Sequence, residues 1–157
     1  MAWTESGLFY ASWRDDLKNA ISPDISLVAT GNNISLSGVN DTPNYALDPA
    51  TWTNANEVTG GANWPTGGIN LSTGTYAPTV TAVTGPPLLL MWDMNDISVA
   101  STTTTAAAYG AYIYANALAP KAMIMGIWFG GTGYSTLNGT FGITWNVAGL
   151  LTIQMAA

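Results

Sequence analysis

The chain contains no cysteine and no histidine. The absence of cysteine excludes disulfides, thiolate metal sites and cysteine nucleophiles. The absence of histidine excludes Ser-His-Asp and Cys-His arrangements and imidazole metal ligands, and it removes the side chain that most often serves as a general base. We therefore predict that the protein is not an enzyme, and we expect no catalytic residues, no cofactor and no metal site.

Charged residues are also scarce, at 8% of the 157 residues, against about 25% in an average soluble domain. Only three are cationic, Arg14, Lys18 and Lys121, against nine acidic residues, so the net charge is −6. Three cations cannot neutralise a run of phosphates, and the chain has no Lys/Arg-rich face for binding a membrane surface. We expect neither a nucleic acid nor a membrane as a partner.

Long hydrophobic runs are absent as well. The densest one, Leu88 to Trp92, is five residues long, far short of a membrane span. The N-terminus has no basic region followed by an apolar run, so it does not resemble a secretory signal. We expect synthesis in the cytoplasm without a signal peptide, with the protein left there or packed from there into something larger.

The chain is rich in aromatic side chains, with seven Trp and seven Tyr, and 48% of its residues are hydrophobic. A free monomer normally keeps a charged, mixed surface for solubility, whereas the polar character here comes from Thr, Asn, Ser and Gly. This combination favours a protein that buries much of its surface against partners. The alternative is an acidic monomer kept soluble by its net charge.

The N-terminal segment has the periodicity of a helix. Phe9, Trp13 and Leu17 recur every four residues and form an apolar stripe. Thr4 or Ser6 can serve as the N-cap, and the residue before Pro23 is pushed out of the helical region. We predict a helix over about residues 5–20 that packs its stripe against the core.

After Pro23 the periodicity changes to two, which is typical of strands. We predict a hairpin of strands at 25–30 and 33–38, in a sheet with one buried and one wet face. The continuous apolar run at 88–92 is expected to be covered on both faces. Several short strands separated by turns indicate a sandwich, a jelly roll or a barrel; the further strands are expected at 69–72, 79–83, 88–92, 97–105, 109–114, 123–129, 141–147 and 150–155.

A long loop at about residues 40–67 is rich in turn formers and carries several aromatic side chains. Such a loop is usually functional or packed by its own side chains. Aromatic residues in irregular segments have no strand of their own in which to pack. We therefore expect contacts with a protein partner from Trp3, Tyr45, Trp52 and Trp64.

Acidic residues offer two weaker possibilities. The segment Asp93–Asp96 is interpreted as a turn, because it lacks the spacing of a calcium loop. Two carboxylates could also catalyse glycoside hydrolysis, either Glu57 with Asp48 or Asp93 with Asp96, but nothing in the sequence distinguishes these pairs. Lys121 is interpreted as a surface lysine that discourages edge pairing.

A succession of segments over nearly the whole chain resembles a known family; they are 7–17, 54–61, 64–69, 90–93 with 97–99, 109–114, 129–131 with 134–135, and 141–145. In their order and character these segments are similar to small virion proteins of tailed bacteriophages, of the minor capsid or head decoration type, as found in phages of actinobacteria. Synthesis is then expected in the cytoplasm of a host cell.

The resemblance implies a β-sandwich or jelly-roll module on the outer surface of the capsid, often a homotrimer, that binds the major capsid protein. We expect a mainly β, antiparallel domain over residues 1–157, with an N-terminal arm and helix at 1–22 and the sandwich at 23–157. The predicted function is structural: decoration and stabilisation of the capsid. The alternative is a host-recognition module of a phage head or tail fibre that binds a glycan.

Overall fold

The computed structural model describes residues 5–17, 31–38, 41–71, 74–83 and 88–155. Its fold is mainly β, with antiparallel sheets and one short helix, and it is consistent with a β-sandwich. In chain order the elements are β1 (Gly7–Leu8), α1 (Tyr10–Leu17), β2 (Asn32–Ser37), β3 (Glu57–Val58), η1 (Gly61–Asn63), β4 (Ile69–Asn70), η2 (Gly74–Tyr76), β5 (Thr79–Val83), β6 (Leu88–Asp93), β7 (Ile97–Thr102), β8 (Gly110–Ala115), β9 (Met123–Trp128), β10 (Gly139–Ile143) and β11 (Leu151–Met155).

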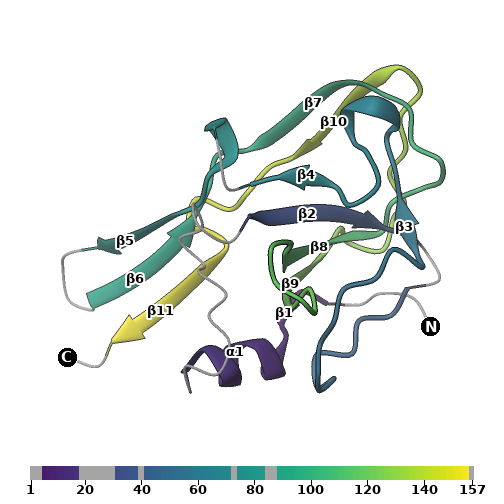
Figure 1. The fold of residues 1–157 in the computed structure, drawn as a ribbon. Coiled ribbons are helices and arrows are strands. Elements are labelled where there is room, and N and C mark those ends of the chain that lie inside the picture. The colour runs from purple at the N-terminus through teal and green to yellow at the C-terminus, as the bar shows by residue number, and fades with distance from the viewer. Residues whose placement is uncertain (1–4, 18–30, 39–40, 72–73, 84–87, 156–157) are drawn as a thin grey trace.

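The strands form three sheets. The largest has the order β1-β9-β8-β2-β3, with β4 pairing to β2 beside β3. A two-stranded sheet pairs β10 with β7, and a three-stranded sheet has the order β11-β6-β5. Figure 1 shows α1 on one side of the large sheet and β7 and β10 on the other, while β5, β6 and β11 extend together to one side.

The main core lies between the large sheet and the strands β6, β7 and β10. Ile34 and Leu36 of β2 and Ile113 of β8 are at most 1% exposed and pack in one cluster with Ile97 of β7 and Phe141 of β10. These side chains alternate along their strands, as expected for the inward face of a sheet. Their burial supplies the main apolar stabilisation of the fold.

The other face of the large sheet is also covered, which corrects the expected wet face. Phe9, Trp52 and Tyr114 belong to a second cluster of buried residues on this side, contributed by the α1 region, the 41–56 loop and β8. All six residues of β2 are therefore buried. Two of its polar side chains have partners in later segments: Ser35 Oγ donates to Glu57 Oε1 of β3 at 3.0 Å, and Asn33 Nδ2 donates to the Gly67 carbonyl at 2.7 Å.

The helix is shorter than predicted. It begins at Tyr10 rather than near residue 5, because Gly7 and Leu8 pair as β1 with the edge of β9. Ser6 does not cap the helix: its hydroxyl accepts a hydrogen bond from the Trp128 backbone N–H at 2.9 Å. Pairing with β9 thus prevails over the local helical preference.

The predicted strands at 33–38, 69–72, 79–83, 88–92, 109–114, 123–129 and 150–155 are confirmed to within a few residues. The partner strand at 25–30, like residues 18–20 of the helix, lies outside the described residues. The strand predicted at 141–147 begins earlier and ends at Ile143, and the one predicted at 97–105 ends at Thr102.

The threonines at the end of β7 hold the neighbouring loop through their hydroxyl groups. Thr103 and Thr104 accept hydrogen bonds from the backbone N–H groups of Asn138 and Thr136 at 2.9 and 3.1 Å. Thr102 Oγ1 lies 2.8 Å from the hydroxyl of Thr136. This run leaves the sheet to fix the loop instead of extending the strand.

Among the described residues, no helix has the length and apolar character needed to cross a membrane.

Candidate functional site

The residues that were predicted to contact a protein partner differ in how far they are buried in the chain's own core. Trp3 lies outside the described residues. Tyr45 is partly buried and packs against Phe9, with ring centroids 5.1 Å apart. Trp64 is fully buried and meets Phe141 edge to face at 5.5 Å. Trp64 therefore presents no surface to a partner, because the loop folds this ring into the chain's own core.

Trp52 is 9% exposed and stacks on Tyr114, with centroids 4.2 Å apart and planes 4° from parallel. Lys121 lies over this pair, with Nζ 5.0 Å from the Trp52 ring and 5.7 Å from the Tyr114 ring. Burial raises the pKa of Tyr114 to about 12, and its hydroxyl donates to the Gly67 carbonyl at 2.6 Å. The sequence interpretation of Lys121 missed these cation–π contacts.

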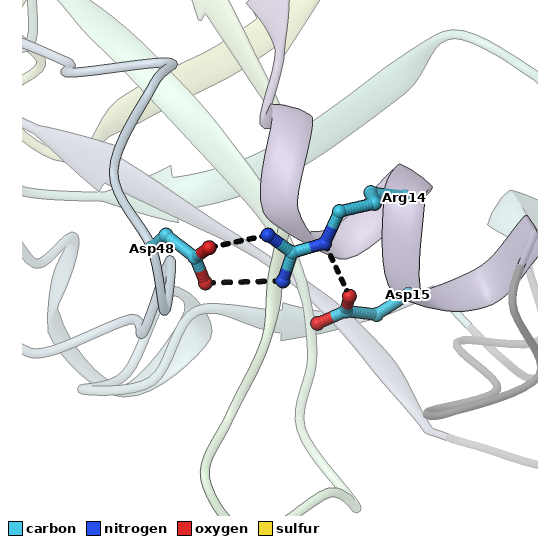
Figure 2. A network of polar contacts seen from close by, with 3 residues as sticks. All are labelled: Arg14, Asp15 and Asp48. Carbon is cyan, nitrogen blue, oxygen red and sulfur yellow. Dashed lines mark hydrogen bonds and ion pairs between the residues drawn. The ribbon is translucent and has the colours of Figure 1, made fainter.

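Two of the carboxylates considered for glycoside hydrolysis, Asp48 and Glu57, make hydrogen bonds that connect segments of the chain. Asp48 pairs with both terminal nitrogens of Arg14, and Asp15 accepts a hydrogen bond from Arg14 Nε at 2.6 Å (Figure 2). These hydrogen bonds raise the pKa of Arg14 and tie α1 to the 41–56 loop. Glu57 accepts hydrogen bonds from Ser35 and from the Gly67 backbone N–H. Asp48 and Glu57 are thus bound to different parts of the structure.

Asp93 is the last residue of β6, and residues 94–96 connect β6 to β7. Asp96 Oδ1 accepts a hydrogen bond from the Trp145 backbone N–H at 2.9 Å, and the Asn95 carbonyl accepts one from the Trp145 indole at 3.0 Å. Asn95 also donates to the Thr75 carbonyl at 2.8 Å. The polar groups of this connection position neighbouring segments, and the described residues contain no group of acidic side chains that could hold a metal ion.

The three-stranded sheet presents an apolar face that the described residues leave open. Cross-strand partners place Ala82, Leu90 and Ile153 side by side on this face, with Val80 two residues away along β5. Val80 is 46% exposed, Leu90 37% and Ile153 45%. We call these four residues the apolar face. The expectation that residues 88–92 are covered on both sides is therefore wrong for Leu90.

The same sheet has two unpaired edges within the described part of the chain, since β6 lies between β5 and β11. Edge strands of soluble proteins are usually protected by charged side chains, proline or bulges. Neither β5 (Thr79–Val83) nor β11 (Leu151–Met155) contains a charged residue or a proline, and both pair with β6 without a register shift. The sheet therefore combines an apolar face with edges open to pairing.

Charge is distributed unevenly along the chain. After Glu57 the sequence contains only Asp93, Asp96 and Lys121 as charged residues. The remaining charges belong to the N-terminal part, where Arg14, Asp15 and Asp48 form ion pairs. The three-stranded sheet therefore carries almost no charge that could repel the apolar surface of another protein.

Sequence reasoning missed the apolar face because the alternation of apolar residues is the same whether a face is covered by the chain or left open. The uncharged composition of the segment 58–92 is the signal that could have indicated it. Comparisons of this chain with protein-family models, with curated proteins and with solved structures find no match.

Proposed function

We propose that this chain is a structural virion protein of a tailed bacteriophage, which assembles with copies of itself and stabilises the capsid by binding the major capsid protein lattice. The observation that carries the proposal is the apolar face of the three-stranded sheet, exposed beside two unprotected edges. Exposed apolar surface of this kind marks an interaction site in soluble proteins. The resemblance of the sequence to phage decoration proteins is the reason for proposing a phage capsid as the particle to which the protein binds.

The apolar face is an extension of the main core. Trp92 lies on the same side of β6 as Leu90, two residues away, and is 2% exposed within the core cluster. Leu151 packs against that cluster, and Ile153 continues the same face outward along β11. A second apolar surface placed on Leu90 and Ile153 would therefore continue the core across an interface, as in permanent homo-oligomers.

The two edges favour a ring of copies. A two-fold pairing through β5 leaves both β11 edges exposed, whereas a ring that pairs β5 of each copy with β11 of the next leaves no edge open. Both strands are antiparallel to β6, so the junctions of this ring are parallel pairs, which are also stable. Three copies enclose their apolar faces around one axis, in accord with the trimer that the resemblance implies.

A protein that binds only the assembled shell stabilises the shell by mass action. A trimer also presents each capsid-binding surface three times, so a modest affinity for each subunit gives strong attachment to a lattice. The scarcity of charge limits repulsion between neighbouring copies despite the net charge of −6.

Immunogold labelling of virions of the phage that encodes this chain tests the proposed location. We expect label over the head, at many positions on each particle. Label confined to the tail tip, or particles without label, would contradict the proposal.

A further inference from the structure

A second surface, separate from the three-stranded sheet, has the form of a ligand site. A groove of about 500 Å³ lies between the end of β9, the loop 130–138 and β10, and its size is within the range of about 300–1,000 Å³ that is typical of small-molecule sites. Trp128, Phe129, Tyr134, Phe141 and Trp145 contribute aromatic rings to its lining. No charged residue is among the described residues that line it.

Three of these aromatic side chains remain accessible, whereas Phe141 is 4% exposed. Tyr134 is 51% exposed and Trp128 37%, and Trp145 is half-buried. Phe129 supports Tyr134 from the side, with centroids 6.2 Å apart at 80°. The groove thus offers flat aromatic surfaces from three neighbouring segments between residues 127 and 145.

Hydrogen bonds fix the residues that form the walls of the groove. Tyr134 and Ala108 exchange two backbone hydrogen bonds, of 2.8 and 2.9 Å. Trp145 is fixed by its hydrogen bonds to Asp96 and Asn95, and the Trp128 N–H is bound by Ser6. A site whose groups are already ordered loses little conformational entropy when a ligand binds.

Hydroxyl groups surround the aromatic surfaces. Ser135, Thr140 and Thr144 are exposed in the lining, as is Tyr134. Within the described part of the chain, none of these four hydroxyls has a hydrogen-bond partner. A hydroxyl both donates and accepts, so this set matches a ligand whose own groups do the same.

We propose that this groove binds a neutral carbohydrate of two or three sugar units. The C–H face of a pyranose ring packs on the negative face of an aromatic ring, while its hydroxyls bond to Ser135, Thr140 and Thr144. An acidic or basic ligand would find no opposite charge in the lining and would lose hydration on entering it. This inference is independent of the proposed assembly role, because the apolar face is built from other strands.

The test uses isothermal titration of the full chain with the neutral trisaccharides maltotriose, cellotriose and β-1,4-galactotriose, and with trigalacturonic acid as the charged counterpart. We expect at least one neutral trisaccharide to bind with a Kd of about 1 mM or tighter. Tyr134→Ala should weaken this binding tenfold or more, and Tyr134→Phe, which removes only the hydroxyl, should weaken it less.

Leu137→Ala is the matched control. Leu137 is 86% exposed in the same loop and does not line the groove, so its removal should leave the affinity unchanged. Ile153→Lys should also leave it unchanged, which separates this site from the assembly proposal. The inference is overturned if no neutral trisaccharide binds, if trigalacturonic acid binds as well as the neutral ligands do, or if Tyr134→Ala and Trp128→Ala both bind like the wild type.

Discussion

Lys121 shows how a single cation is used in a chain with few charges. Its ammonium lies over the stacked rings of Trp52 and Tyr114, and its backbone carbonyl accepts a hydrogen bond from the Trp52 N–H at 2.8 Å. The residue thus holds the 41–56 loop against the sheet through both its backbone and its side chain.

We predict that Lys121→Met, which keeps the aliphatic stem and removes the charge, lowers the free energy of unfolding by about 0.5–1 kcal/mol. Lys121→Arg, which retains a cation above the rings, should remain close to the wild type. Urea denaturation of the three proteins measures the difference. Equal stability of all three would show that the cation–π contacts contribute nothing.

Trp64 was predicted to contact a partner, but its position in the structure is that of a core residue. Its ring is fully buried against Phe141, and its indole N–H has no partner among the described residues. We predict that Trp64→Ala lowers the free energy of unfolding by about 3–5 kcal/mol. Trp64→Phe should cost less, because it keeps a ring in the core and removes the unpaired donor. If Trp64→Ala unfolds at the same urea concentration as the wild type, the ring is not part of the core.

Sequence alone could not separate these roles for Trp52 and Trp64. Both lie in irregular segments without periodicity, so nothing in the local pattern indicates which way the ring points. Their burial depends on long-range contacts with Tyr114 and Phe141, which only the fold determines.

Among the elements, β4 depends on a glycine that precedes it. Gly68 has a φ of 72°, and a Cβ atom there would lie 1.9 Å from the Ile34 carbonyl oxygen of β2. Gly61 has a similar φ of 74° but has no atom within 4 Å of the position of a Cβ. The two glycines therefore separate the cost of the backbone conformation from the cost of a steric clash.

We predict that Gly61→Ala lowers the free energy of unfolding by about 1 kcal/mol, the cost of a left-handed conformation. Gly68→Ala should cost about 4 kcal/mol or more, because β4 must also move away from β2. Thermal unfolding of both variants provides the comparison. Similar melting temperatures for the two would contradict the close approach of β4 to β2.

Strands were more predictable than the helix, and the reason is physical. A period of two survives whichever face is buried, so β2 and β5 could be placed from the alternation alone. The start of α1 was decided by the pairing of Gly7 and Leu8 with β9, a contact that local periodicity does not contain. The buried polar face of β2 was missed for the same reason, since it is covered by the distant 41–56 loop.

For the whole molecule, the account depends on how charge and apolar surface are separated. Ion pairs gather around Arg14, whereas the apolar face around Leu90 and Ile153 has no charged side chain. The scarcity of charge was evident from the sequence and indicated assembly, but the surface that assembles could be located only once the strands were paired.

The central claim is that copies of this chain associate through the apolar face, and the molar mass in solution, measured by light scattering after size exclusion, tests it most directly. We expect three times the chain mass of 16.4 kDa for the wild type and for Thr81→Lys, since Thr81 lies on the opposite side of β5 from Val80 and Ala82. Ile153→Lys and Leu90→Lys should give the mass of one chain with an unchanged circular dichroism spectrum. A wild-type monomer, or an oligomer that both lysine variants preserve, would contradict the account.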